Sequence, residues 1–70
     1  MSEVKSKVPG VVDEVKAAAG DKIEKGQVVI VLEAMKMKVP VVATASGQVT
    51  SILVAEGDPV EIGQVLITIG

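Results

Sequence analysis

The apolar residues of this chain fall into short runs separated by turn-forming residues. Two runs rich in β-branched side chains, Val11–Val15 and Val49–Val54, are typical of β-strands. Two others, Val28–Leu32 and Val65–Ile69, are almost continuously apolar, which predicts strands covered on both faces in a small sandwich or barrel. Turn signals lie between the runs, at Gly20-Asp21 and Gly57-Asp58. The pattern predicts an all-β fold.

The second half of the chain repeats the first. When residues 1–33 are shifted by 37 positions onto residues 38–70, 11 of the 33 aligned pairs are identical. Gly20-Asp21 falls on Gly57-Asp58, and Gly26-Gln27-Val28 falls on Gly63-Gln64-Val65. Two copies are too few for a solenoid. The repeat therefore predicts one closed domain over residues 1–70, with an internal pseudo-twofold axis.

The repeat also predicts where the middle of the chain lies. Residues 34–37 join the two copies. Under a twofold axis, the equivalent joint is the gap between the two chain ends. We therefore expect residues 34–37 and the termini at opposite ends of the molecule.

Two local features refine the strand pattern. Pro40 cannot donate a hydrogen bond to a ladder, so its strand is expected at a sheet edge or at a bulge. Ala17–Ala19 precede a glycine and are too few to nucleate a helix, so we expect none there.

The composition removes most kinds of chemistry. The 70 residues contain no Cys and no His, which excludes disulfides and thiolate metal sites and removes the commonest general base. There is no aromatic residue and the net charge is −2 at pH 7, which argues against nucleic-acid binding. A domain this small leaves little room for a ligand pocket of about 300–1,000 Å³. We expect a non-catalytic protein, with no metal ligands, that acts through a partner or an attached group.

Membrane insertion is not expected either. The longest apolar run, Val28–Leu32, is far shorter than the roughly 20 residues that span a bilayer. Residues Met1–Lys5 lack the apolar segment of a signal peptide. The simple interpretation is a cytoplasmic protein.

The joint between the two copies holds an unusual tetrapeptide, Ala34-Met35-Lys36-Met37. It lies between two β-runs, so it predicts a tight hairpin, yet it has none of the Gly, Asn or Asp that such turns prefer. We therefore expect backbone strain at Met35 and Lys36, of order 1–3 kcal/mol each. In an exposed hairpin, Lys36 could reach an external active site. Met35 and Met37 could also be ordinary half-buried residues, and Glu33 simply a charge on the strand face.

Glu33-Ala34-Met35-Lys36-Met37 resembles the attachment motif of biotinyl domains, the biotin carboxyl carrier family. Segments on both sides, Pro9–Val12, Val54–Val60 and Gly63–Leu66, are also similar to that family, so the resemblance covers essentially the whole chain. It implies a flattened β-barrel, or barrel-sandwich hybrid, of two four-stranded antiparallel sheets. It also implies that a biotin protein ligase joins biotin covalently to Lys36 and recognises the neighbouring residues Glu33, Ala34, Met35 and Met37.

The same resemblance implies a carrier role. Biotin on Lys36, as a swinging arm, would take a carboxyl group at a biotin carboxylase and deliver it at a carboxyltransferase. In decarboxylases, a carboxylated substrate supplies the group.

Two features of this chain depart from the pattern of many family members and narrow the interpretation. Gly10–Gly26 has the same length as Gly47–Gly63, so the insertion of many acetyl-CoA carboxylase carriers is absent. Lys38 stands where an acidic or amide residue is usual.

Two other functions stay open. A lipoyl carrier of a 2-oxo acid dehydrogenase or glycine cleavage system has the same fold and hairpin lysine, but usually an Asp-Lys-Ala motif, whereas Lys36 lies between two methionines. An unmodified barrel could act as an interaction module. The sequence favours biotin and does not identify the acyl substrate.

Overall fold

The computed structural model describes residues 2–70 and contains eight β-strands and no helix in that range. The strands are β1 (Ser2–Lys5), β2 (Gly10–Val15), β3 (Lys22–Ile23), β4 (Val28–Ala34), β5 (Met37–Val42), β6 (Gly47–Ile52), β7 (Pro59–Val60) and β8 (Val65–Ile69). They form two four-stranded sheets, with the orders β1-β8-β6-β3 and β5-β4-β2-β7, and every pairing is antiparallel. The all-β prediction is confirmed, as is the absence of a helix at Ala17–Ala19.

The internal repeat is visible in the sheet topology. The 37-residue shift carries β2 onto β6 and β3 onto β7 with identical bounds, β4 onto β8, and β1 onto β5. It therefore converts the strand order of one sheet into that of the other. Each sheet takes two adjacent strands, an inner pair, from one copy and its remaining strands from the other, so the copies interleave and are not separate half-barrels.

The hydrophobic core follows the same symmetry. Six pairs of buried apolar residues are related by the 37-residue shift: Val12/Val49, Ala17/Val54, Ile23/Val60, Val29/Leu66, Ile30/Ile67 and Leu32/Ile69. Complete burial of a Val, Leu or Ile side chain stabilises a fold by about 1.5–3 kcal/mol. Because the core is entirely aliphatic, this paired packing between the sheets is the main source of stability in so short a chain.

β-Bulges explain the long apolar runs. In β4 the pairing with β5 skips Val29, and in β8 the pairing with β1 skips Leu66, so two successive residues are buried in each strand. Val31 and Thr68, which lie between inward-facing residues, are only half-buried. The prediction that these strands are covered on both faces is therefore wrong at these positions. The bulge buries two neighbouring residues in the core, so the apolar run does not require a second layer on the outer face of the sheet.

The repeated turn residues make the same hydrogen bonds in both copies. The carboxylate of Asp21 accepts from the Ala18 amide at 2.9 Å, and that of Asp58 accepts from the Ala55 amide at 2.9 Å. Gln27 and Gln64 likewise accept from the amides of Glu24 and Glu61, at 3.1 and 3.0 Å. The repeated Asp and Gln residues thus stabilise equivalent turns in the two copies, next to the glycines at which the sequence predicts turns.

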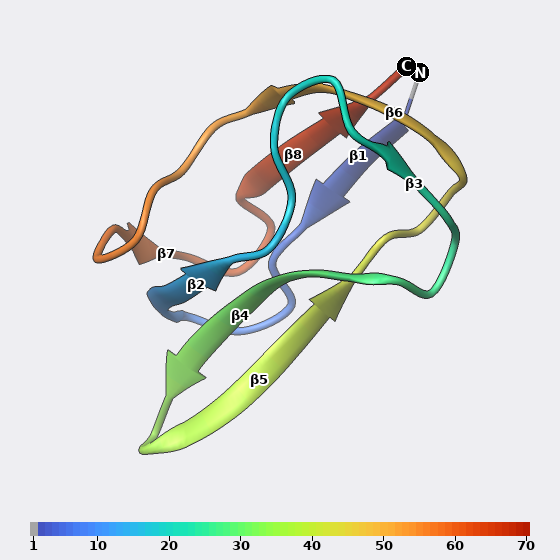
Figure 1. Cartoon of the computed structure of the whole chain (residues 1–70). Helices are drawn as coiled ribbons and strands as arrows, with labels where there is room; N and C mark the ends of the chain where they lie inside the picture. Colours follow the sequence, from blue (N-terminus) through green and yellow to red (C-terminus); the bar gives the residue numbers. More distant parts are fainter. Residues whose placement is uncertain (1) are drawn as a thin grey trace.

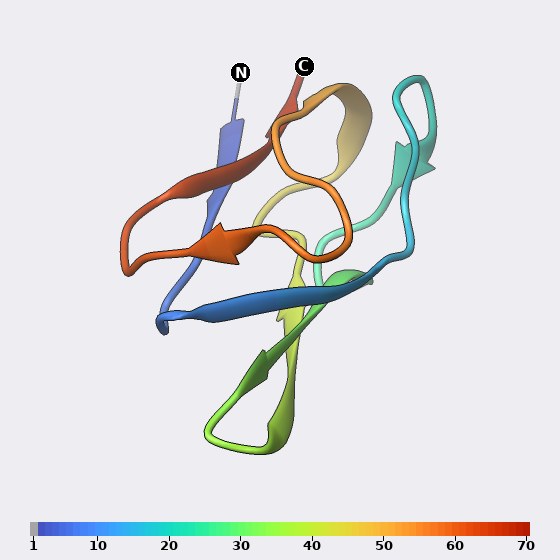
Figure 2. The same ribbon diagram turned by 90° about the vertical axis from the view of Figure 1, so that its left-hand side faces the viewer.

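The termini and the β4–β5 hairpin lie at opposite ends of the molecule, as the repeat predicts (Figure 1). Figure 2 shows the same arrangement after a quarter turn, with the hairpin extending below the rest of the fold. Its outer strand, β5, is at the edge of its sheet. That position accommodates Pro40, which has no amide hydrogen to donate.

Candidate attachment site

The β4–β5 hairpin closes in the tightest way that two strands allow. Ala34 pairs with Met37 across the ladder, which leaves only Met35 and Lys36 for the turn. Both turn residues have positive φ, 53° and 65°, as a type I′ turn requires. They are the only non-glycine residues with positive φ among residues 2–70. The predicted strain is therefore present at this turn, at a position where glycine would have avoided it.

The side chains of the turn point into solvent. Met35 is 94% exposed and Met37 is 66% exposed. Lys36 is also exposed, and within residues 2–70 it forms no ion pair. The interpretation of Met35 and Met37 as ordinary half-buried residues is therefore wrong. An acyl group on Lys36 Nζ would meet no packed neighbour, so the site accommodates a covalently attached group.

The residues that precede the turn differ in their surroundings. Ala34 is half-buried, whereas the Glu33 side chain is 51% exposed. Gly10 of β2 lies directly beside them, because a Cβ atom at Gly10 would lie 2.6 Å from the Glu33 carbonyl oxygen and 3.3 Å from Ala34 Cβ. The absence of a side chain at Gly10 therefore lets β2 approach the stem of the hairpin closely.

A network of three charged residues crosses the stem of the hairpin. Lys38 pairs directly with Glu33 across the β4–β5 ladder, and its Nζ lies 3.1 Å from Glu33 Oε2. The same Nζ lies 2.8 Å from Asp13 Oδ1 of β2. Hydrogen bonds with Asp13, and then with Glu33, raise the pKa of Lys38 above its ordinary value of 10.5. One ammonium thus links three neighbouring strands beneath the turn.

Comparison with known proteins identifies the family. A family model described as "Biotin-requiring enzyme", the biotin/lipoyl family, matches residues 1–69. This chain belongs to the biotin/lipoyl family. The assignment rests on nearly the whole domain and is not limited to the motif around Lys36.

Two relatives show which members of the biotin/lipoyl family this chain resembles. The biotin/lipoyl attachment protein of Bacillus subtilis is 59% identical over 34 residues, which are 49% of this chain and 47% of that protein. The biotinylated protein TB7.3 homolog of Mycobacterium leprae is 42% identical over 48 residues, 69% of this chain and 68% of that protein. The match therefore spans about half the length of the Bacillus relative.

The urea carboxylase of Kluyveromyces lactis contains a very similar fold. The two structures superpose with a TM-score of 0.93 and 40% sequence identity, over 99% of this chain and 6% of the much longer carboxylase. The flattened barrel expected from the sequence is thus the biotin/lipoyl fold. In the urea carboxylase, this fold is one small part of a large enzyme.

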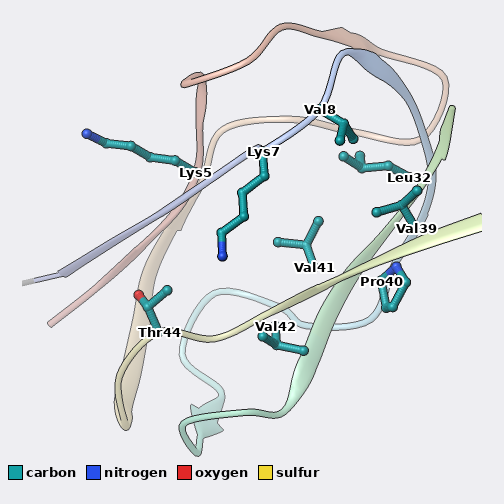
Figure 3. A pocket seen from close by; sticks show the side chains of 9 residues that line it. All are labelled: Lys5, Lys7, Val8, Leu32, Val39, Pro40, Val41, Val42 and Thr44. Atoms are coloured by element: carbon teal, nitrogen blue, oxygen red, sulfur yellow. The ribbon is translucent and has the colours of Figure 1, made fainter.

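This biotin/lipoyl domain has a small cavity away from the turn. It has a volume of about 120 Å³ and is lined by Lys5, Lys7, Val8, Leu32, Val39, Pro40, Val41, Val42 and Thr44. Val8, Leu32 and Val39 gather at one end of it, and the Lys5 side chain points away from them (Figure 3). Ligand pockets usually hold about 300–1,000 Å³. A second hollow, of about 440 Å³ beside β3 and β6, is wide open to solvent, so neither is a deep pocket.

The described part of the domain holds no other candidate centre. Among residues 2–70 there is no group of three or more potential metal ligands of the His, Cys, Asp or Glu type. In the same range, no helix is long and apolar enough to cross a membrane. The exposed turn at Lys36 is therefore the feature of these residues that is best suited to function.

The sequence alone did not single out Asp13 or Gly10 as part of this site. Asp13 reaches Lys38 because the pairing of β2 with β4 skips it, between Val12↔Leu32 and Glu14↔Val31. The opposition of Glu33 and Lys38 follows from a two-residue turn and could have been read from the sequence. The contact with Asp13 also needs the strand order and the bulge, which no local pattern specifies.

Proposed function

We propose that this chain is a biotin carboxyl carrier and that biotin is attached through an amide bond to Lys36 Nζ. The observation that carries the proposal is the placement of Lys36. Lys36 is exposed, lies between two exposed methionines in the sequence, and belongs to a strained two-residue turn. Among residues 2–70 it has no ion-pair partner. Lys36 is in the turn of the β4–β5 hairpin. In this member of the biotin/lipoyl family, that hairpin is at the end of the molecule opposite the termini (Figure 1).

The chain's part in the attachment is to present one amine. The neutral form of Lys36 attacks an activated acyl carbon, the amide C–N bond forms as the leaving group departs, and the ammonium proton passes to solvent. The net charge then changes from −2 to −3 at pH 7, because one lysine charge is removed. When bound, biotin supplies a ureido nitrogen that accepts and releases a carboxyl group.

A biotin protein ligase is the proposed partner for this step. Met35 and Met37 offer it exposed apolar surface on both sides of Lys36, and Glu33 offers a carboxylate on the outer face of β4. Ala34 is half-buried, and its small side chain would let the ligase approach the end of β4 closely. Recognition of a rigid hairpin has a low entropic cost because the turn is already ordered.

The proposed functional partners are a biotin carboxylase and a carboxyltransferase or decarboxylase. The similarity to part of a urea carboxylase supports a role in a carboxylation reaction. The chain itself is a non-catalytic carrier. A swinging arm on Lys36 would raise the effective concentration of the carried group at both partners. A cytoplasmic location remains a prediction.

A lipoyl carrier is the second candidate, since the name of the Bacillus relative includes both groups. The flanking residues favour biotin, because Lys36 lies between two methionines and not in an Asp-Lys-Ala sequence. An unmodified interaction module is less well supported, because it gives no reason for an exposed Met-Lys-Met segment with positive φ at Met35 and Lys36.

Transfer of a carboxyl group tests the carrier role. The biotinylated chain is incubated with a biotin carboxylase, ATP and labelled bicarbonate, and protein-bound label is measured after rapid desalting. We expect acid-labile label on the biotinylated chain and none on its Lys36→Arg variant. Label on neither protein, with a carboxylase that carboxylates free biotin, would argue against the proposal.

A further inference from the structure

Two lysines lie two positions apart at this hairpin, and a modifying enzyme must choose between them. Lys36 is in the turn and Lys38 is the second residue of β5. Both side chains are at the surface, and the Lys38 side chain is 58% exposed. Exposure alone therefore does not explain how acylation would be limited to a single residue.

The ion pairs distinguish the two amines. Lys38 Nζ lies within hydrogen-bond distance of two carboxylates, at 2.8 Å from Asp13 Oδ1 and 3.1 Å from Glu33 Oε2. Among residues 2–70, Lys36 forms no ion pair, and each of the other paired lysines, Lys5 and Lys16, contacts a single carboxylate. Lys38 is thus the one lysine in this range held by two carboxylates at once.

The fold itself does not require this network. The 37-residue shift places Asp13 on Thr50 and Glu33 on Gly70, so neither equivalent position has a charged side chain. At that end, the Thr50 hydroxyl lies 2.6 Å from the Thr68 hydroxyl. Both ends of the sheets have the same bulge and the same strand order. The charged network is therefore specific to the hairpin end.

We propose that Asp13 and Glu33 hold Lys38 as an ammonium on the outer face of the sheet, so that acylation at this hairpin is confined to Lys36. The inference rests on the proposed attachment at Lys36 and adds the residues that exclude its neighbour. Only a neutral amine attacks an acyl carbon. Two carboxylates that hydrogen-bond the charged form disfavour the neutral form, and they turn Nζ toward β2, away from the tip.

A chemical acylating reagent tests this without a ligase. The whole chain is treated with N-hydroxysuccinimidyl biotin at pH 8. In this reaction an amide forms, the ester C–O bond breaks, N-hydroxysuccinimide leaves, and the proton goes to solvent. Fragmentation mass spectrometry then gives the rate at each lysine. We expect Lys38 to be the slowest of the lysines, and its rate relative to Lys36 to rise roughly three- to tenfold in an Asp13→Asn/Glu33→Gln variant.

Three comparisons make the result decisive. Glu33→Gln alone, which keeps Asp13, is expected to give an intermediate rate at Lys38. Glu14→Gln removes the single pair of Lys16 at 3.4 Å and should leave Lys38 unchanged. Lys25 forms no ion pair among residues 2–70. Acylation of Lys38 as fast as that of Lys25 in the native chain, or no rise in the folded double variant, would overturn the inference. Because no ligase is used, failure of the proposed attachment at Lys36 would be seen separately.

Discussion

Ala34 and Met37 face each other at the end of the β4–β5 ladder, so that the turn between them contains only two residues. That single pairing forces positive φ on Met35 and Lys36. The turn therefore retains strain that a glycine or asparagine would relieve. A feature that costs stability and is kept at an exposed tip calls for a functional explanation.

Relief of this strain is measurable. Asparagine tolerates positive φ, so Met35→Asn is expected to stabilise the domain by roughly 0.5–1 kcal/mol, a fraction of the 1–3 kcal/mol that such a residue costs. Urea unfolding gives the difference. The matched control is Met37→Asn, which places asparagine in strand β5. Because asparagine is unfavourable in strands, this variant should not be more stable than the native domain. Equal losses of stability in the two variants would mean that Met35 is not strained.

The pseudo-twofold axis predicts equal costs for equivalent core changes. Ile30 and Ile67 are completely buried and are related by the 37-residue shift. Ile30→Val and Ile67→Val should each destabilise the domain by about 0.5–1.5 kcal/mol, with denaturation midpoints close to each other. Val11→Ala, at a 44% exposed position of β2, serves as a surface control. A cost confined to one isoleucine would show that the two halves of the core are not equivalent.

The two turn carboxylates form a second symmetric pair. Asp21 and Asp58 each accept a hydrogen bond from a backbone amide three residues earlier, at 2.9 Å. Loss of such a bond in Asp21→Ala or Asp58→Ala should destabilise the domain by about 0.5–1.5 kcal/mol. Glu56→Ala, in the same turn as Asp58, is the control. Thermal or urea unfolding of the three variants at one pH makes the comparison, and the prediction fails if Glu56→Ala is as costly.

The charged network at the stem predicts a pH dependence at the alkaline end. Hydrogen bonds with Asp13 and Glu33 raise the pKa of Lys38 above 10.5 in the folded chain. The stabilisation is therefore complete below pH 10.5 and is lost as the pH rises through the folded pKa. The difference in unfolding free energy between the native chain and Lys38→Met should be constant from pH 7 to about pH 10 and then shrink. A Lys38 difference that grows with pH would contradict the assignment.

Much of this architecture follows from the sequence. The repeat of Gly20-Asp21 at Gly57-Asp58 predicts both the symmetry and the placement of Lys36 opposite the termini, because a repeated chain has only one joint and one gap. The missing glycine between Ala34 and Met37 predicts a strained turn. Pro40 predicts an edge strand. Each of these inferences depends on local stereochemistry or on counting along the chain.

The remaining features depend on contacts between distant strands. A repeat does not specify whether its copies pair within themselves or interleave, and the structure interleaves them. The bulges at Val29 and Asp13 shift the register by one residue, and this shift brings Asp13 to Lys38 and buries neighbouring apolar residues. The close approach of Gly10 to Glu33 likewise appears only when β2 and β4 are side by side.

The central claim, that Lys36 is the single attachment point for biotin, is tested most directly by intact-mass measurement. The native chain and its Lys36→Arg and Lys38→Arg variants are each expressed with a biotin protein ligase and biotin. We predict a gain of one biotinyl group on the native chain and on Lys38→Arg, and no gain on Lys36→Arg. An unchanged mass of the native chain, or a biotinyl group on Lys36→Arg, would contradict the account.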